Sequence, residues 1–236
     1  MANPIDWLGR FLGRFDASNF LGCRLVISHR YKCIFIHIPR SGGSSIEDVI
    51  WSAGERTEAN LWMGFIRPMH NKYQTGGLQH LLARQVRDEV GRETFAQYFK
   101  FTFVRNPWDK AVSQFNYTMQ SRPDLRKFAG ISEHASFEEY LDRIRAVPHV
   151  QWEQQVKFLY DANGELLMDL VGRFESFDAS AIAVFDRLGL KVTAVPHVNR
   201  SIRTAKSVYS KEARDLIAEH YADDIKAFGY TCPWTS

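Results

Sequence analysis

The most constraining feature of this sequence is an apolar run that breaks into a turn of glycine and serine. Residues 33–46 read CIFIHIPRSGGSSI, in which the apolar stretch ends at Pro39 and a segment with helical spacing follows the turn. We predict a buried strand, a turn and a helix, in that order. Gly42 and Gly43 let the backbone curl without a Cβ clash, and the turn amides at the helix N-terminus face an anion. The pattern therefore predicts a phosphate cradle.

The side chains of the same turn also suit an anion. Arg40 adds a fixed positive charge, and hydroxyl donors are added by Ser41, Ser44 and Ser45. An ordinary strand–turn–helix unit with a serine N-cap has the same local pattern. Taken alone, residues 33–46 leave both interpretations open.

A second segment repeats the order of strand, turn and helix. Residues 99–113 read FKFTFVRNPWDKAVS, and their aromatic and β-branched strand ends at Arg105. Pro107 stands where a first helical residue tolerates a missing N–H. Ser113 lies about two helical turns further on, so that Arg105 and Ser113 can reach one phosphate from two sides. A helix-start proline beside a surface arginine is the alternative, but two such segments in one small chain favour anion binding.

The pair HIPRSGGSS and FVRNPWDKAVS resembles the two nucleotide-binding motifs of sulfotransferases, specifically the Golgi-type and bacterial carbohydrate sulfotransferases. These enzymes use 3′-phosphoadenosine 5′-phosphosulfate (PAPS). The resemblance implies that the first motif, from Arg40 to Ser45, holds the 5′-phosphosulfate. It also implies that Arg105 and Ser113 hold the 3′-phosphate, and that no metal is required.

The resemblance covers roughly residues 30 to 230. It continues in FLYDANG at 158–164, VGRFE at 171–175, PHVNRS at 196–201 and FGY at 228–230. It further implies that Ser201 and Arg203, in a polar loop before the last helix, contact the nucleotide, although a plain surface loop has the same composition. The implied cofactor-binding residues are Arg40, Ser41, Gly42, Gly43, Ser44, Ser45, Arg105, Ser113, Ser201 and Arg203.

One position departs from the family pattern. Members usually carry Lys where this chain has Arg40, and that Lys is thought to stabilise the oxygen that bridges sulfate and leaving phosphate. Arginine keeps the charge and presents a planar fork of donors, but it is bulkier and always protonated. We therefore expect donor binding to survive. A catalytically weak or non-catalytic nucleotide- or glycan-binding homologue is the alternative to an active enzyme.

Transfer of a sulfuryl group to a hydroxyl also needs a base. His80 follows a double-glycine turn and begins a predicted helix, and related carbohydrate sulfotransferases often have a histidine ahead of the second motif. An imidazole titrates near neutrality, which suits this role. His80 is therefore the first candidate base, and Arg40 is its charged catalytic partner. His70 is the second candidate and Glu58 the third; a helix-capping or partly buried structural histidine is the alternative for His80.

A P-loop kinase or NTPase is the competing class of enzyme. Its motif, G-x-x-x-x-G-K-[ST], places a Lys after the glycines and a Ser or Thr that holds Mg²⁺. In this chain the cation of the turn, Arg40, precedes the glycines, and Gly43 is followed by serine. The sequence therefore favours a sulfotransferase over a kinase.

Helical and strand segments alternate along the chain, as an α/β fold requires. Strands are predicted at 31–38, 99–104 and 166–174, and helices at 44–52, 80–90, 107–119, 136–146, 149–160, 179–188 and 210–229. We expect a single domain over residues 1–236 with a three-layer α/β/α architecture. Its central sheet should be mainly parallel, with a P-loop-like nucleotide-binding core at the strand ends.

Composition supports a globular chain and excludes several other classes of protein. With 45% hydrophobic residues and a net charge of +3, the chain is neither disordered nor basic enough for a nucleic-acid-binding signature. It has no apolar run of membrane-spanning length. Separated cysteines and scattered histidines argue against a disulfide framework and a metal site. No signal-peptide pattern is seen. Animal members of the family that the chain resembles usually carry a membrane anchor and lumenal disulfides, so we expect a bacterial-type cytoplasmic protein.

Two segments differ from the rest of the chain. Residues 1–20 place large apolar side chains at helical spacing beside Arg10 and Arg14. We expect this amphipathic segment to dock on its own domain or on a partner subunit rather than to lie in a membrane interface. Residues 52–79 mix aromatic, glycine and polar residues without a period, which is typical of a functional loop. We expect this loop to bind the acceptor, which the resemblance implies is a carbohydrate or glycolipid hydroxyl.

Overall fold

The computed structural model describes residues 26–51, 65–67, 70–71, 80–192, 194–196 and 210–234. Its strands are β1 (Ile27–Ser28), β2 (Cys33–Ile36), β3 (Phe65–Arg67), β4 (His70–Asn71), β5 (Phe99–Val104) and β6 (Leu170–Arg173). Its α-helices are α2 (Gly43–Ile50), α4 (Ala83–Val90), α5 (Arg92–Gln97), α6 (Pro107–Ser121), α7 (Pro123–Ala129), α8 (Phe137–Ala146), α9 (Gln155–Leu159), α10 (Phe177–Arg187), α11 (Lys211–His220) and α12 (Ala222–Phe228). Two short 3₁₀ helices are η4 (Val150–Trp152) and η5 (Phe174–Ser176).

The central sheet has four strands in the order β1-β2-β5-β6. Strand β5 lies between β2 and β6 and runs parallel to both, with Phe35 opposite Phe101 and Phe103 opposite Gly172. Strand β1 is antiparallel to β2 at one edge. The predicted mainly parallel sheet is therefore confirmed, and the loops that follow β2 and β5 leave it at the same edge.

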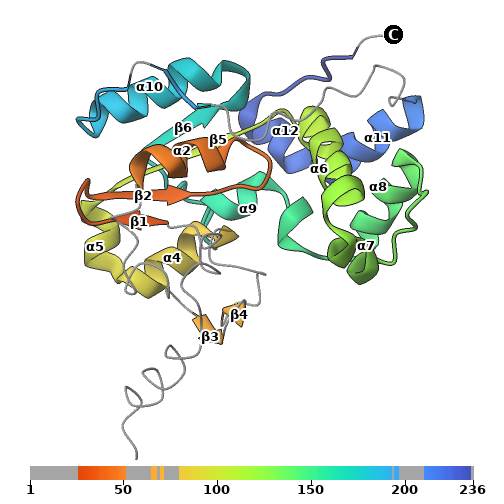
Figure 1. Ribbon diagram of the computed structural model, residues 1–236, viewed down its shortest axis with the longest axis horizontal. Coiled ribbons are helices and arrows are strands. Elements are labelled where there is room, and N and C mark those ends of the chain that lie inside the picture. The colour runs from red at the N-terminus through yellow and green to blue at the C-terminus, as the bar shows by residue number, and fades with distance from the viewer. Residues whose placement is uncertain are drawn as a thin grey trace, which may run out of the picture.

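Side chains alternate between the two faces of this sheet. Phe35, Phe101 and Phe103 pack with residues of α2 and α10, whereas Ile34 and Ile36 pack with residues of α4 and α6. Figure 1 shows α2 and α10 above the sheet and α4 and α5 below it. The fold therefore has the predicted three layers of helix, sheet and helix.

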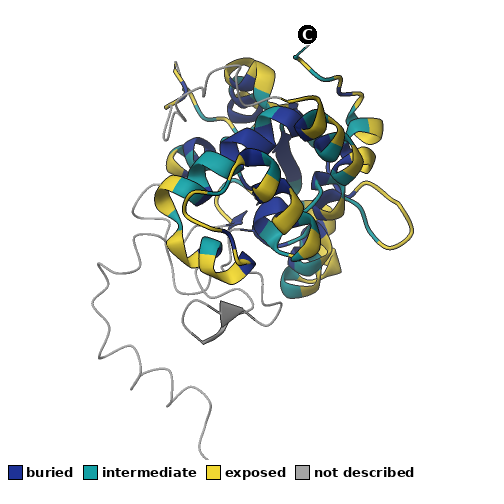
Figure 2. Cartoon of the chain, turned by 90° about the vertical axis from the view of Figure 1, so that its right-hand side faces the viewer, coloured by how far each residue is buried: buried dark blue, intermediate teal, exposed yellow. Residues whose placement is uncertain are grey.

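A group of helices, α6, α7, α8 and α11, lies beside the sheet (Figure 1). Helix α6 is anchored there by Trp108, which is buried and donates from Nε1 to the Arg214 carbonyl over 3.2 Å. The buried residues gather on the sheet and on the helix sides that face it, with exposed residues on the outside (Figure 2). The N-terminal half of α6, which carries the second motif, is thus fixed in the core.

The prediction of one continuous helix at 149–160 is wrong. It is divided into η4 and α9, with the break at Glu153 and Gln154. The first amides of α9, those of Gln155 and Val156, each donate to the Asp224 carboxylate over 2.9 Å. A carboxylate from another helix therefore caps a new N-terminus in the middle of the predicted helix.

The predicted C-terminal helix is also divided, because Tyr221 leaves helical geometry between α11 and α12. Tyr221 is fully buried, and its hydroxyl donates to the Trp152 carbonyl. The predicted strand at 166–174 shortens to β6, since Leu166 instead forms an isolated bridge with Tyr160. Strand β1 and helices α5 and α7 were not predicted from the sequence.

Several sequence predictions fall on residues outside the described ranges. These are the N-terminal segment 1–20, Glu58, Ser201 and Arg203, together with nearly all of 52–79. Of His70 only the backbone is described, in β4. Within the described ranges, no helix is both long and apolar enough to cross a membrane.

Candidate functional site

The first motif forms the loop between β2 and α2. Arg40 has a φ of 66° and Gly42 a φ of 87°, so two residues of the turn adopt the left-handed conformation. For Arg40, which has a Cβ, this conformation costs about 1–2 kcal/mol. The Ser41 hydroxyl, 1% exposed, donates to the Ile38 carbonyl over 2.6 Å. Ser41 therefore closes the turn, although the sequence predicted it as a hydroxyl donor to an anion.

Helix α2 begins with features that suit an anion. Its N-cap is Gly42, which has no side chain to cap the first amides, and its first turn contains no acidic residue. The positive end of the helix dipole is therefore neither capped nor neutralised by a local carboxylate. Ser44 is half-buried and Ser45 buried in this first turn.

The turn is packed too tightly to accept any residue except glycine at two positions. A Cβ on Gly43 would lie 2.2 Å from the His37 ring, and one on Gly42 would lie 2.7 Å from the Phe177 ring. His37 is held below the turn by Glu47 of α2, with 2.8 Å between Nδ1 and Oε1. Both side chains are buried, so His37 is a core residue.

The second motif differs from the first in how its helix begins. The Asn106 side chain caps α6 by accepting the Trp108 amide over 3.1 Å, and Asp109 lies in the first turn. The Asn106 amide donates in turn to Glu175 over 2.6 Å. Because protein groups already satisfy this helix start, anion binding by the second motif rests on the side chains of Arg105 and Ser113.

The two motifs meet at Arg40. Its Nε donates to the Ser113 hydroxyl over 3.1 Å, and Arg105 Nη1 donates to the Arg40 carbonyl over 3.1 Å. The structure thus brings together three of the predicted site residues from loops far apart in the sequence. It also shows a contact that the sequence did not predict, since Arg105 supports the strained backbone of Arg40.

Each guanidinium of this pair lies on an aromatic ring. The Arg40 Cζ is 4.6 Å from the centroid of the Tyr117 ring, and the Arg105 Cζ is 4.2 Å from that of Phe174. Burial lowers the pKa of Arg40, and the nearby Tyr117 raises it. Arginine stays protonated at neutral pH in proteins, so both residues are positive charges of fixed orientation.

A buried network behind Arg105 fixes its backbone. The Gln155 side chain accepts from the Arg105 amide over 2.8 Å and donates to its carbonyl over 2.8 Å. Gln155 is held by Asp224 of α12, which accepts from its amide. The sequence gave no signal for this network, because its members lie in α9 and α12, far along the chain from the motif.

Lys110 completes this network and makes stability depend on pH. It is fully buried on α6, donates to the Glu153 carbonyl over 3.2 Å and lies 4.9 Å from the Tyr221 ring centroid. Burial lowers its pKa to about 8, against the attraction of Asp224. Between pH 8 and the ordinary lysine pKa, Lys110 therefore binds fewer protons in the folded chain than in the unfolded chain, so its own contribution to stability rises with pH in this range. The raised pKa of Cys33 acts in the opposite direction above about pH 9.

We expect the Lys110→Met variant to lose this dependence. The difference in unfolding free energy between wild type and variant should shift by about 2 kcal/mol in favour of wild type from pH 7.5 to 9.5. Urea denaturation at several pH values measures it. Cys33 and the buried tyrosines titrate in both proteins and cancel in the difference. A constant difference over this range would show that Lys110 does not titrate there.

Glu175 connects the second motif to the C-terminal segment. Its carboxylate accepts from the Asn106 amide and from the Tyr230 hydroxyl, the latter over 3.1 Å. Arg173 donates to the Phe228 carbonyl. Burial, and then the Glu175 charge, raise the pKa of Tyr230. Glu175 therefore ties the start of α6 to the C-terminal segment.

His80 lies beside the end of β2. It is 4% exposed, its Nδ1 is 3.0 Å from the His37 carbonyl, and its ring centroid is 4.9 Å from that of His37. Because a carbonyl only accepts, Nδ1 carries the proton in this contact. Helix α4 begins at Ala83, so the prediction that His80 starts the helix is wrong.

Among the described residues, no cluster of three or more His, Cys, Asp or Glu side chains could hold a metal ion. Two cysteines in these ranges, Cys33 and Cys232, are free thiols. Burial raises the pKa of Cys33 to about 12, so it is a core residue without thiolate character.

Comparison with known proteins agrees with this geometry. A model described as "Sulfotransferase family" matches residues 24–231, nearly the whole chain. The chain belongs to the sulfotransferase family. This membership confirms the resemblance carried by the two motifs and supports sulfuryl transfer in general as its chemistry.

Individual relatives are more distant. An uncharacterized protein of Archaeoglobus fulgidus is 26% identical over 116 residues, which are 46% of this chain and 82% of that protein. Among solved structures, mouse sulfotransferase SULT7A1 complexed with PAP (adenosine 3′,5′-bisphosphate) aligns with this chain at 14% identity and a TM-score of 0.38. The alignment covers 82% of this chain but only 65% of the mouse chain, so this protein spans less than two thirds of that length.

Proposed function

We propose that this protein transfers a sulfuryl group from PAPS to a hydroxyl of a carbohydrate or glycolipid. The observation that carries the proposal is the meeting of two anion-binding motifs at Arg40, in a chain of the sulfotransferase family. PAPS has anionic groups at both ends of its ribose, and the two motifs offer one set of donors for each.

The residues present fit such a donor. The turn from Arg40 to Ser45 offers a guanidinium and the N-terminus of α2, which no side chain caps, to the 5′-phosphosulfate. Arg105 and Ser113 offer a second guanidinium and a buried hydroxyl to the 3′-phosphate. Ser201 and Arg203 stay predicted contacts from the later loop.

The chemistry needs few groups from the protein. The acceptor oxygen forms a bond to sulfur while the bond from sulfur to the bridging phosphate oxygen breaks, and adenosine 3′,5′-bisphosphate (PAP) leaves. We assign the acceptor proton to Nε2 of His80, because Nδ1 is occupied by the His37 carbonyl. Arg40 stabilises the charge that develops on the leaving oxygen.

The acceptor class rests on the resemblance to carbohydrate sulfotransferases, and the segment 52–79 is proposed to bind it. A bacterial origin and a cytoplasmic location are proposed on the same grounds. A binding protein that does not turn over PAPS is the alternative, because Arg40 cannot act as a proton donor. A kinase function has no support from the family match, and the turn has no lysine after its glycines.

We expect PAP to bind with micromolar affinity and Arg105→Ala to abolish detectable binding. The variant removes a charge-assisted contact to the 3′-phosphate and the hydrogen bond that holds the Arg40 carbonyl, so an affinity loss of at least about 100-fold is expected. Isothermal titration calorimetry of both proteins measures this.

Arg143→Ala is the matched control, since Arg143 is an exposed arginine on α8 and its loss should leave PAP affinity unchanged. ATP with Mg²⁺ is titrated in parallel. A folded wild type that binds ATP with Mg²⁺ but not PAP would contradict the proposed function.

A further inference from the structure

The position of the Arg40 guanidinium is set by α6 and not by its own loop. The left-handed backbone of Arg40 belongs to no regular element. Two contacts orient the side chain: Nε donates to Ser113, and the Cζ lies 4.6 Å from the Tyr117 ring centroid. Ser113 and Tyr117 are four residues apart, so they lie on one face of the helix, one turn from each other.

The two contacts involve different atoms of the guanidinium. Ser113 binds Nε, and the Tyr117 ring lies near the central Cζ. Among the described residues, Nε is the only nitrogen of Arg40 with a hydrogen-bond partner. The terminal nitrogens are therefore the ones that can reach the phosphosulfate, and the direction in which they point depends on the ring.

Tyr117 also contacts Arg122. Its hydroxyl accepts from Arg122 Nη1 over 3.2 Å, and the Arg122 Cζ lies 5.7 Å from the ring centroid. Asp124, in the first turn of α7, accepts from Arg122 Nε over 2.8 Å and from Nη2 over 2.5 Å. The two-point ion pair orients Arg122 beside the tyrosine.

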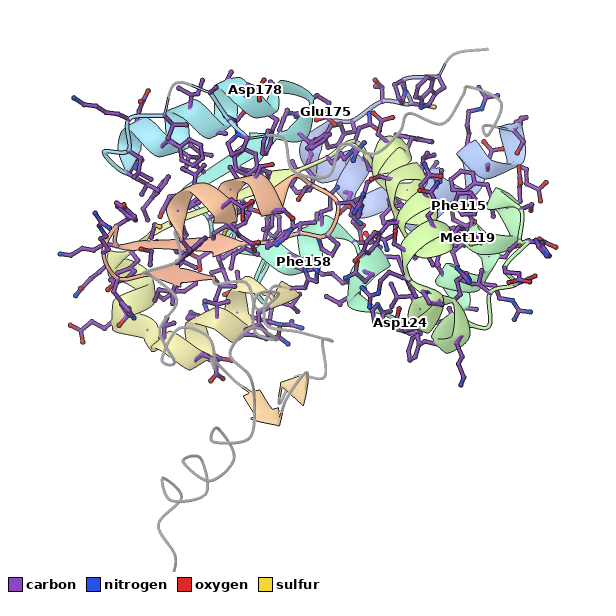
Figure 3. All side chains as sticks on the ribbon, viewed as in Figure 1. Phe115, Met119, Asp124, Phe158, Glu175 and Asp178 are labelled. Carbon is purple, nitrogen blue, oxygen red and sulfur yellow. The ribbon has the colours of Figure 1, made fainter. Side chains whose placement is uncertain are left out.

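Figure 3 shows where this chain of contacts begins, with Asp124 at the corner between α6 and α7. It also labels Phe115 and Met119, which lie on the side of α6 toward α8 and α11. Phe115 packs against Phe137 and Tyr140, with 5.2 Å between ring centroids in each pair. One side of α6 thus packs in the core, and the side with Tyr117 contacts Arg40.

We propose that Tyr117 is a positioning residue for Arg40, acting through its aromatic ring. A free arginine side chain samples many rotamers, whereas a guanidinium stacked on a fixed ring has one plane. The inference rests on the proposed function for its role in donor binding. The contact between the Arg40 guanidinium and the Tyr117 ring is itself a property of the fold and can be tested separately.

The stack is tested first without any ligand, by the ¹H–¹⁵N NMR signal of the Arg40 Nε–H, assigned by its loss in Arg40→Lys. The ring current of Tyr117 should shift this signal, so Tyr117→Leu should move it toward the random-coil position and Tyr117→Phe should not. Phe115→Leu is the matched control, because it also removes an aromatic ring from α6, but from the core side. An unchanged signal in Tyr117→Leu overturns the proposal.

The role in donor binding is then tested with PAP. Tyr117→Leu should weaken PAP binding roughly tenfold, while Tyr117→Phe stays within about threefold of wild type. Phe115→Leu should lower the melting temperature without weakening PAP binding. Equal PAP affinity of Tyr117→Leu and wild type overturns the positioning role. If the wild type does not bind PAP, the proposed function is wrong. The NMR signal of the Arg40 Nε–H still tests whether Tyr117 contacts Arg40, because that experiment needs no ligand.

Discussion

The His80→Asn variant is expected to lower the rate of sulfuryl transfer by about 10²–10⁴-fold while PAP affinity stays within about threefold of wild type. The Asn amide can keep a donor for the His37 carbonyl, where Nδ1 now lies 3.0 Å away, but it has no basic nitrogen in place of Nε2. Transfer of labelled sulfate from PAPS to a panel of carbohydrate and glycolipid acceptors measures the rate. Calorimetry with PAP measures the affinity.

His134→Asn is the control for this experiment, because the His134 side chain is 86% exposed. It should transfer sulfate at the wild-type rate. A folded His80→Asn protein with full activity would contradict the assignment and make His70 and then Glu58 the next candidates. If the wild type binds PAP but transfers no sulfate to the panel, the binding-only alternative is favoured.

Gly43→Ala should be among the most damaging small substitutions in the protein. The new Cβ would lie 2.2 Å from the His37 ring, which cannot move without breaking its buried contact with Glu47. Overpacking and loss of this pair together should cost about 3 kcal/mol or more. For a chain of this size the melting temperature should fall by on the order of 10 °C, and PAP binding should be lost as the turn shifts.

A second substitution tests this explanation. His37→Ala vacates the space that the new Cβ needs, so the double variant should be more stable than the sum of the two single effects predicts. Gly130→Ala is the control for replacing a glycine, because no atom lies within 4 Å of its Cβ and only its φ of 65° is strained. It should cost about 1 kcal/mol. Additive effects of the two substitutions at 37 and 43 would contradict the packing argument.

The parts of the fold that sequence could predict are those set by local pattern. The strand at 99–104 was predicted with its observed ends, since an aromatic and β-branched run is bounded there by Arg105 and a helix-start proline. The turn after β2 was predicted from Gly42 and Gly43, because two adjacent glycines after an apolar run are a local signal for a turn. Both motifs were therefore placed correctly at the same edge of the sheet.

The parts that could not be predicted depend on contacts across the fold. Nothing in the spacing of the second motif indicates that Tyr117 lies on Arg40, because this depends on how α6 packs against the first loop. The break before α9 depends on Asp224, about seventy residues away in sequence. Ser41 was predicted as an anion ligand from its residue type, yet its hydroxyl donates a hydrogen bond to a backbone carbonyl three residues earlier.

The central claim is that the two loops joined at Arg40 bind one PAPS molecule at its two anionic ends. A crystal structure of the wild-type protein with PAP tests it most directly. We predict the 3′-phosphate within hydrogen-bond distance of Arg105 and Ser113, and the 5′-phosphate against Arg40 and the first amides of α2. A well-ordered PAP whose phosphates contact neither loop would contradict the account.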